Sequence, residues 1–151
     1  METVVTLADS SHINLLTELM REFYTIEHLK FDERVVRHAL QQILNDASLG
    51  QVYLIGTTDE VIGYIVVTFG FSLEFHGRDA LIDEFYLRES YRGRGIGKAT
   101  LQFIHEVCRR EGIKALSLEV NKENKRAQTF YQQAGYLDRG NYLLTKWLEE
   151  K

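Results

Sequence analysis

The sequence predicts an α/β (α+β) domain, with a mixed, mostly antiparallel central sheet of about seven strands and helices on both faces. Three observations indicate this fold class. Apolar runs with strand composition fill the middle of the chain, stretches with helical periodicity flank them, and a glycine-rich turn joins a strand to a helix. The 151 residues contain no linker, internal repeat or low-complexity tract. We therefore expect a single domain over residues 1–151.

The N-terminal part of the chain predicts one strand and two helices. The apolar segment Val4–Leu7 is typical of a short strand. Apolar residues then recur at helical spacing from Ile13 to Phe23. A polar-aromatic connection, Tyr24–Phe31, leads to Asp32, which is a suitable N-cap for a second helix whose apolar face runs through Val35–Leu44.

Strand patterns dominate the middle of the chain. The apolar runs Gln51–Thr57 and Val61–Phe71 are separated by a short polar link and predict a hairpin. After a polar-aromatic excursion, Ala80–Leu87 is the next strand. Beyond the glycine-rich turn, the amphipathic run Lys98–Glu111 predicts a helix.

The C-terminal part predicts a strand, a short helix and a final hairpin. The strand is Ala115–Val120, and the helix Asn124–Ala134 is closed by Gly135. Two strands, Tyr136–Leu137 and Tyr142–Leu148, are expected to form the hairpin around a polar turn.

Composition excludes several classes of protein. A net charge of −4 disfavours a general nucleic-acid binder, which would carry a basic surface. One cysteine is too few for a disulfide framework or a cysteine-based zinc cluster. No apolar run resembles a signal peptide or approaches membrane-spanning length, so we expect a cytoplasmic location and no membrane partner. Glu74, His76 and Asp79 lie near one another in a turn, but they have no helical i, i+4 pair and no fourth ligand, so we expect no metal site.

The stretch Asp83–Gly97 combines a strand, a polar link and a glycine-rich turn that opens a helix. Gly93, Gly95 and Gly97 remove side chains where the backbone must turn or approach a ligand. A helix start offers unpaired N–H groups and the positive end of the helix dipole. Four cations add positive charge: Arg88, Arg92, Arg94 and Lys98. The stretch therefore predicts a phosphate-binding cradle.

The spacing of these glycines decides which kind of cradle is present. A dinucleotide fingerprint would require glycine at Lys98 or Thr100, and a P-loop would require glycine at Arg92 and a hydroxyl residue at Ala99. Neither pattern fits. The pattern Arg92-x-x-Gly95-x-Gly97 after a strand resembles the acetyl-CoA signature of the GCN5-related N-acetyltransferase family. Residues 124–136 are similar to the second conserved block of the same family.

The resemblance implies that acetyl-CoA is a co-substrate. In that family the strands before the cradle and after its helix lie parallel and splay apart. The exposed backbone amides then pair with the pantetheine arm, and Phe85 and Leu87 are the expected partners here. The residues expected to bind acetyl-CoA are Phe85, Tyr86, Leu87, Arg92, Gly93, Arg94, Gly95, Ile96, Gly97, Lys98 and Asn124.

Acetyl transfer to an amine requires a base that removes a proton from the acceptor. Asp83 and Glu84 stand where members of the family often carry a carboxylate. Regular strand alternation would place Asp83 on the face of Phe85, and Glu84 on the face of Ile82 and Tyr86, unless a bulge intervenes. We favour Asp83 as the base and retain Glu84 as either base or substrate anchor.

The departing thiolate requires a proton donor or another stabilising group. Tyr131 occupies the position of the family's tyrosine acid, and its phenol is protonated at neutral pH. Simple packing beside Phe130 is the alternative role. Asn124 either caps its helix or also contacts CoA. Tyr24, Glu27 and His28 are candidate specificity residues, because the segment that holds them forms a wall of the acceptor pocket in this family.

The sequence thus predicts an N-acetyltransferase that moves acetyl from acetyl-CoA directly to a primary amine. Acidic residues in the segments that border the acceptor side favour a cationic amine, either small or on a peptide. A catalytically weak acetyl-CoA sensor or protein-interaction module is the alternative, and a nucleotide-binding domain is a more distant one. The apolar final strand, with Tyr142 and Trp147, offers a surface for a homodimer, unless Trp147 closes the core.

Overall fold

The structure is a computed structural model in which residues 2–149 are described. Contacts divide the chain into two compact units, Met1–Glu119 and Val120–Lys151. The larger unit holds the sheet and three of the helices, and the smaller one holds a single short helix among the described residues.

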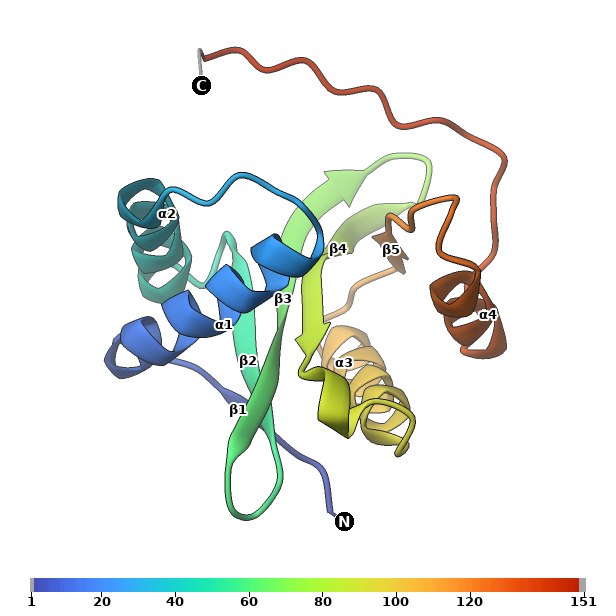
Figure 1. The fold of residues 1–151 in the computed structure, drawn as a ribbon. Coiled ribbons are helices and arrows are strands. Elements are labelled where there is room, and N and C mark those ends of the chain that lie inside the picture. The colour runs from blue at the N-terminus through green and yellow to red at the C-terminus, as the bar shows by residue number, and fades with distance from the viewer. Residues whose placement is uncertain (1, 150–151) are drawn as a thin grey trace. The chain divides into compact units, whose positions relative to one another are not determined.

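The larger unit contains five strands and three helices (Figure 1). In chain order these are β1 (Val4–Leu7), α1 (Ile13–Ile26), α2 (Glu33–Asn45), β2 (Gly50–Gly56), β3 (Val61–Ser72), β4 (Gly77–Leu87), α3 (Ile96–Arg110) and β5 (Ala115–Leu118). Short 3-10 turns, Ser10–His12 and Glu89–Tyr91, precede α1 and α3. The spatial order of the strands is β1-β2-β3-β4-β5. The pairs from β1 to β4 are antiparallel, and β4 and β5 are parallel. The predicted mixed, mostly antiparallel sheet is confirmed.

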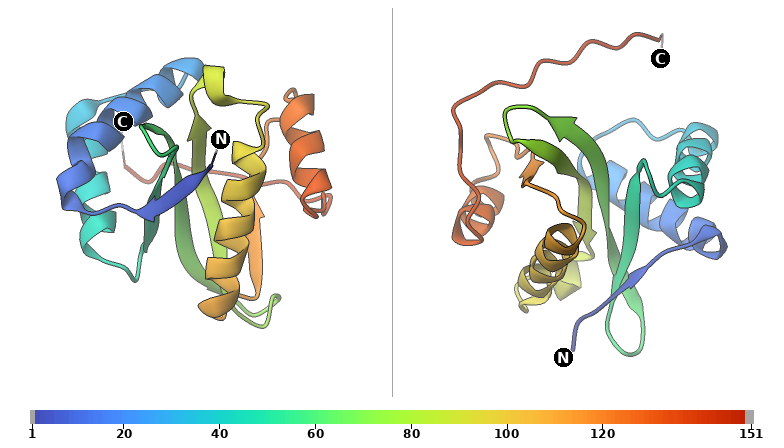
Figure 2. Two further views of the ribbon diagram at one scale, coloured as in Figure 1. Left: turned by 90° about the horizontal axis from the view of Figure 1, so that it is seen from below. Right: turned by 180° about the vertical axis from the view of Figure 1, so that it is seen from behind.

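Helices lie on both faces of this sheet, with α1 and α2 on one face and α3 on the other (Figures 1 and 2). The first face is packed by alternate strand residues, including Leu54, Tyr64 and Val66, against the apolar side of α1. On the second face, the ring centroids of Tyr53 and Phe103 of α3 lie 5.4 Å apart. Because successive strand residues point to opposite faces, strands buried on both sides read as nearly continuous apolar runs.

Side-chain caps determine where two of the helices begin. The Asp32 carboxylate accepts hydrogen bonds from the backbone N–H groups of Arg34 and Val35, at 3.1 and 3.5 Å, and so starts α2. In the smaller unit, the Asn124 side chain accepts from Ala127 N at 3.0 Å and starts α4 (Lys125–Gln133). The capping role proposed for Asn124 is therefore confirmed.

The predicted final hairpin is the main difference between expectation and structure. Among the described residues, none after β5 forms a strand, so the sheet has five strands where about seven were expected. Leu144 and Leu148 are each 91% exposed, and Trp147 is 67% exposed. The physical reason is that an apolar run reports strand propensity, whereas a strand exists only where a second strand pairs with it. This segment is also apolar at successive positions, so no buried face specifies a register.

Several boundaries also differ from the predicted ones, including the start of β4 at Gly77, three residues before Ala80, and the end of β5 at Leu118, two residues before Val120. Tyr24 was expected in the connection after the first helix, but it lies inside α1, which continues to Ile26. Ring contacts with Phe23 (5.8 Å) and Phe31 (5.6 Å) hold Tyr24 in place and account for the longer helix. Helix α3 begins at Ile96, two residues earlier than the amphipathic run suggested.

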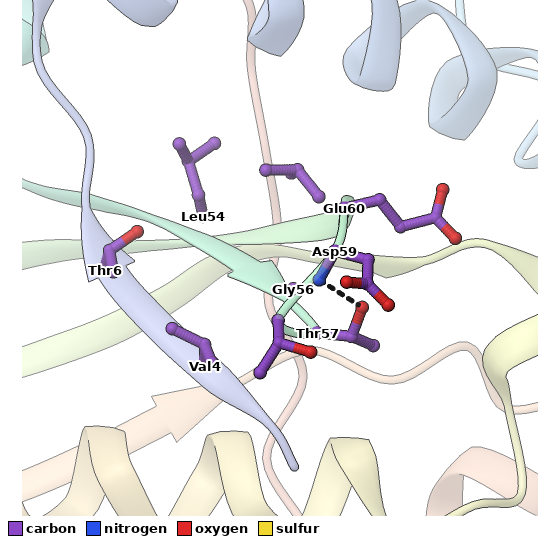
Figure 3. A pocket seen from close by; sticks show the side chains of 9 residues that line it. Val4, Thr6, Leu54, Gly56, Thr57, Asp59 and Glu60 are labelled. Carbon is purple, nitrogen blue, oxygen red and sulfur yellow. Dashed lines mark hydrogen bonds between the residues drawn. The ribbon is translucent and has the colours of Figure 1, made fainter. Parts of the chain in front are cut away.

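A hollow lies between β1 and the β2–β3 hairpin, where it is lined by Val4, Thr6, Leu54 and residues 56–61 (Figure 3). Its one marked polar contact is the hydrogen bond from Asp59 N to Thr57 Oγ1, at 3.3 Å. None of the residues predicted to bind acetyl-CoA or to act in catalysis lines this hollow.

Candidate active site

Strand β4 continues past the end of its parallel partner. The β4–β5 pairing runs from Asp79↔Ala115 to Ile82↔Leu118, whereas β4 extends to Leu87. In the larger unit, residues 84–87 are therefore paired with β3 on one side only, and Asp83 is paired with neither neighbouring strand. The family resemblance implied that these two parallel strands splay apart here, and the early end of their pairing agrees with it.

The alternation of antiparallel hydrogen bonds indicates which backbone groups of β4 face the unpaired side. Arg88 N donates to Ile62 O at 2.9 Å. Since bonded and non-bonded positions alternate along an antiparallel pair, the main-chain groups of Phe85 and Leu87 point away from β3. Leu87 O accepts a hydrogen bond from Arg92 Nε at 2.9 Å. The amides of Phe85 and Leu87 are thus oriented as a co-substrate arm would require.

The glycine-rich turn leads directly into α3. Gly93 and Gly95 have positive φ angles of 75° and 82°, in the left-handed region that favours glycine. Gly95 is the N-cap of α3, and no side chain caps this end of the helix. The first N–H groups of α3 consequently have no intrahelical partner and carry the positive end of the dipole. A Cβ built on Gly95 would have no atom within 4 Å, so the protein itself leaves room above the turn.

The cations of the turn are held by neighbouring groups. Arg92 Cζ lies 6.0 Å from the ring centroid of Tyr86, and Arg94 Cζ lies 5.5 Å from that of Tyr91. These contacts and the Arg92–Leu87 hydrogen bond place positive charge beside the start of α3. The arrangement fits a phosphate-bearing ligand.

A bulge changes the faces on which the two candidate bases lie. Val66 pairs with Glu84 and the next residue, Val67, pairs with Ile82, so Asp83 is the extra residue of β4. Ile65 and Val67 lie on the same face of β3, and they pair with Phe85 and Ile82. Ile82 and Phe85 therefore share a face of β4, whereas Ile82 was expected to share a face with Glu84. A bulge cannot be read from the sequence of β4, because it depends on the register with β3.

Glu84 is enclosed by two phenols. Tyr64 OH donates to Oε1 at 2.7 Å, and Tyr24 OH donates to Oε2. Burial raises the pKa of Glu84, the two phenol hydrogen bonds oppose that rise, and the neighbouring Asp83 charge adds to it. Burial likewise raises the pKa of Tyr24 and Tyr64, with the Glu84 charge as the second cause. Both phenols therefore act as donors.

Asp83 lies in a different environment on the adjacent position. Its side chain is exposed, and no hydrogen bond to its carboxylate occurs within residues 2–149. The surrounding protein removes part of its hydration and so raises the pKa of the carboxyl above its ordinary value. Asp83 also lies close enough to Tyr24 and Tyr64 to raise the pKa of both. The two carboxylates thus share one electrostatic environment, but only Glu84 has hydrogen-bond donors.

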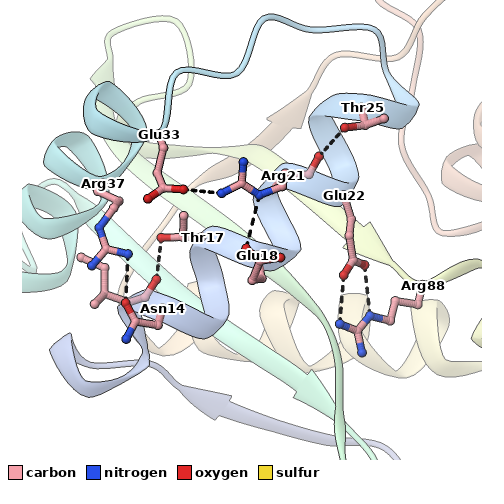
Figure 4. Close-up of polar contacts among 10 residues, drawn as sticks. Asn14, Thr17, Glu18, Arg21, Glu22, Thr25, Glu33, Arg37 and Arg88 are labelled. Carbon is pink, nitrogen blue, oxygen red and sulfur yellow. Dashed lines mark hydrogen bonds and ion pairs between the residues drawn. The ribbon is translucent and has the colours of Figure 1, made fainter.

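A second polar cluster ties α1 to the end of β4 (Figure 4). Glu22 accepts two hydrogen bonds from Arg88, from Nε to Oε1 and from Nη2 to Oε2, each at 3.0 Å. Tyr86 OH donates to the same carboxylate at 2.9 Å. The Arg88 guanidinium is the main cause that lowers the pKa of Glu22. This cluster fixes the helix that carries Tyr24 against the strand that carries the carboxylates.

The remaining predicted catalytic residue lies in the smaller unit. Tyr131 of α4 is half-buried, and its ring lies 5.1 Å from that of Phe130 and 5.6 Å from that of Tyr136, both edge-on. Burial raises the pKa of Tyr131 to about 12. Its phenol therefore stays protonated well above neutral pH, as a proton donor must.

Sequence reasoning missed Tyr64 and the Glu22–Arg88 pair. Tyr64 is fully buried and reads as one more aromatic residue of an apolar strand, and its bond to Glu84 spans 20 positions. Glu22 and Arg88 lie 66 positions apart, and nothing in either segment signals the other. Tyr24 was included among the candidate specificity residues, although its position was assigned to a loop.

Within the described residues, no group of three or more His, Cys, Asp or Glu side chains is arranged to hold a metal ion. No helix among the same residues has the length and apolar character needed to cross a membrane. Cys108 is a free, buried thiol on α3, and burial raises its pKa.

Comparison with known proteins identifies the family. The model of the acetyltransferase (GNAT) family matches residues 13–136. The chain belongs to the acetyltransferase (GNAT) family. The matched region includes both segments that suggested the resemblance, the glycine-rich turn and residues 124–136.

Individual relatives agree with this assignment. Thialysine N-epsilon-acetyltransferase from Bos taurus is 35% identical over 78 residues, which is 52% of this chain and 45% of the relative. The match therefore spans less than half of that relative's length. An integron cassette protein, HFX_CASS3, from the mobile metagenome of Cole Harbour Salt Marsh is 32% identical at a TM-score of 0.87, covering 97% of this chain and 91% of its own. A possible acetyltransferase from Clostridium difficile 630 shares the fold, with a TM-score of 0.85, 20% identity and full coverage of both chains.

Proposed function

We propose that this chain is an N-acetyltransferase that transfers the acetyl group of acetyl-CoA to a primary amine carrying positive charge. The observation that carries the proposal is the end of β4. The backbone N–H groups of Phe85 and Leu87, which point away from β3, are followed directly by an uncapped helix start with positive φ at Gly95. That combination suits a ligand with an amide-bearing arm and a phosphate group.

Acetyl-CoA has both of these chemical features. The backbone N–H groups from Gly93 to Lys98 would hold the pyrophosphate, with Arg92 and Arg94 as its charge partners. The amides of Phe85 and Leu87 would pair with the pantetheine arm. Open space above Gly95 supports this assignment, because a close backbone approach requires a position without a side chain.

The acceptor amine must lose a proton when it attacks the thioester, and Asp83 is the proposed base. Its carboxylate is exposed and has no donor among the described residues, so it is available to the amine. Its raised pKa brings its proton affinity closer to neutral pH, where a base is most effective. Glu84, with both oxygens occupied by phenols, serves as a fixed negative charge that anchors a cationic acceptor.

Tyr131 is the proposed acid that protonates the departing thiolate. The support is its position in the family motif and its phenol, which remains protonated at working pH. The thioester carbonyl develops negative charge during attack, and a backbone amide at the strand divergence can stabilise it.

Cationic acceptors are favoured by the carboxylates near the bulge. Asp83 and Glu84 lie side by side on β4, and neither is paired with an arginine or lysine in the described part of the chain. A thialysine acetyltransferase among the relatives agrees with an amine acceptor. The identity of the acceptor amine, its size and any homodimer formed through the apolar C-terminal segment remain predictions.

A binding experiment followed by a turnover experiment tests the proposal. Calorimetric titration with acetyl-CoA, CoA, ATP and NAD should show binding of the two CoA compounds. Neither ATP nor NAD should displace them. Binding of ATP or NAD in preference to CoA would support a nucleotide-binding domain instead. Tight acetyl-CoA binding without release of free thiol in the presence of any amine would support the acetyl-CoA sensor.

A further inference from the structure

The two carboxylates of β4 differ in how the surrounding residues treat them. Glu84 is held from two elements, by Tyr64 of β3 at 2.7 Å and by Tyr24 of α1. Each phenol takes one oxygen, so the carboxylate cannot rotate without losing both bonds. Asp83, one position earlier, has no such donors within residues 2–149.

Packing keeps both phenols in place. The Tyr64 side chain is fully buried, and its ring contacts those of Phe23 and Tyr86, at 6.3 and 6.2 Å. Tyr24 is fixed on α1 by its edge-on contact with Phe31, and the Arg21 guanidinium lies 4.8 Å from the centroid of the Phe31 ring. These are rigid donors, because a phenol restrained by packing loses little entropy when it forms a hydrogen bond.

We infer that Tyr24 and Tyr64 are positioning residues that reserve Glu84 as a fixed anion and leave Asp83 as the carboxylate that takes the acceptor's proton. The inference rests on the proposed acetyl transfer. The hydrogen bonds of the two tyrosines thus decide which of the two adjacent carboxylates accepts the proton. The acceptor attacks through the lone pair of its neutral amine, the proton that its nitrogen gives up passes to an Asp83 oxygen, and Glu84 keeps its charge throughout.

Hydrogen bonds donated to an anion stabilise it, so the phenols oppose protonation of Glu84. Burial raises the pKa of both carboxyl groups, and the neighbouring Asp83 charge raises that of Glu84 further. The two phenol hydrogen bonds are therefore what favours the charged form of Glu84, and Asp83 has none. Environments that separate two neighbouring carboxyl groups in this way assign one of them to proton transfer.

Other charged groups on this face do not change that reasoning. Glu22 on α1 is paired with Arg88, the residue after β4, at 3.0 Å, and its remaining contact is the phenol of Tyr86. Arg92 lies over the Tyr86 ring. The groups that act on Glu84 are Tyr24 from α1, Tyr64 from β3 and Asp83 from β4 itself.

The test is a pH titration of the ligand-free protein in which NMR monitors the individual carboxyl groups. Side-chain carboxyl carbons of Asp and Glu are labelled with ¹³C, and the two signals are assigned with Asp83→Asn and Glu84→Gln. In the wild type, Glu84 should titrate at lower pH than Asp83. Tyr24→Phe, which keeps the ring and removes the donor, should move the Glu84 titration upward by about one pH unit. Tyr53→Phe is the matched control, because its hydroxyl donates to Gln51 at 2.6 Å on the opposite face of the sheet.

The outcomes are decisive without an acceptor. Glu84 titrating above Asp83 in the wild type would overturn the inference, as would an unmoved Glu84 signal in a folded Tyr24→Phe variant. A shift of similar size in Tyr53→Phe would show that the effect is unspecific and would overturn it too. Tyr64→Phe should move Glu84 in the same direction as Tyr24→Phe and provides a second variant.

Kinetics then connect the arrangement to turnover. In Tyr24→Phe, the acidic limb of kcat/KM should move to higher pH, because Glu84 is then protonated, and lost as the anionic anchor of the amine, at a higher pH than in the wild type. In a Glu84→Gln background, Tyr24→Phe should leave that limb unmoved. A limb that moves equally in both backgrounds contradicts the inference. If the wild type acetylates no amine, the proposed function fails, and the NMR titration still decides how the two carboxylates are arranged.

Discussion

Replacing Gly95 by alanine separates the binding role of the cradle from its backbone strain. Gly95 has φ of 82° and ψ of 0°, a left-handed conformation that costs an L-residue about 1–2 kcal/mol. An added methyl group would meet no atom within 4 Å, so this backbone cost is the whole effect on folding. For a domain of this size, we expect Tm to fall by about 2–8 °C.

The loss of ligand affinity should be larger than the strain alone explains. If the turn closes on a pyrophosphate, the new methyl group occupies space that the ligand needs. The loss of one charge-assisted hydrogen bond is worth about 1.5–3 kcal/mol, so CoA affinity should fall at least about tenfold. Calorimetric titration of the folded variant, with circular dichroism to check its fold, measures both quantities.

Gly112 provides the matched control at the other end of α3. It has φ of 76°, and a Cβ built on it also has no atom within 4 Å. Gly112→Ala should therefore lose a similar amount of stability and keep its CoA affinity within about twofold, since it lies outside the cradle. Unchanged CoA affinity in folded Gly95→Ala would refute the cradle assignment, and an equal loss in Gly112→Ala would refute the reasoning.

Four other substitutions test individual side chains. Tyr131→Phe should lower kcat and kcat/KM together, by about 10²–10⁴-fold for a lost general acid, with acetyl-CoA affinity nearly unchanged; activity within about twofold of the wild type would leave the phenol a packing role only. Asp83→Asn should flatten the acidic limb of the pH–rate profile, whereas Glu84→Gln should mainly raise KM for the amine; the reverse pattern would exchange their roles. Glu22→Gln tests the Arg88 pair: the lowered pKa of Glu22 means that its stabilisation is present above the ordinary glutamate pKa and is lost as pH falls through the folded-state value. Because both side chains are about one-third exposed, that stabilisation is only about 0.5–1 kcal/mol, so the variant should be slightly less stable to heat at pH 7, and the two proteins should converge once the pH falls below the folded-state pKa of Glu22. A difference that persists in acid would contradict the ionic origin.

Local patterns in the sequence predicted most of the helices and strands. The four N-terminal strands, the caps at Asp32 and Asn124, and the glycine turn before α3 all follow from period, cap chemistry and backbone preference. The final hairpin could not be established in this way. Its residues are suitable for strands, but pairing is a property of two segments, and the sequence gives the propensity of each one separately.

The candidate site shows the same limit at the level of side chains. The sequence singled out Asp83 and Glu84 but could not distinguish their environments. That distinction depends on a bulge opposite Val66 and Val67, and on phenols 20 and 60 positions away from Glu84. Long-range register and helix packing decide these contacts, and neither leaves a local pattern.

The central claim is tested most directly by offering the protein acetyl-CoA and a panel of amines. Free-thiol release measures turnover, and mass spectrometry of the acceptor identifies the acetylated product. The panel should include polyamines, aminoglycosides, lysine analogues and basic peptides, together with anionic acceptors of similar size. We expect thiol release coupled to acetylation of cationic primary amines, with a rate advantage that falls as salt is added. Anionic acceptors outperforming the cationic ones, or thiol release that never exceeds the amine-free blank, would contradict the account.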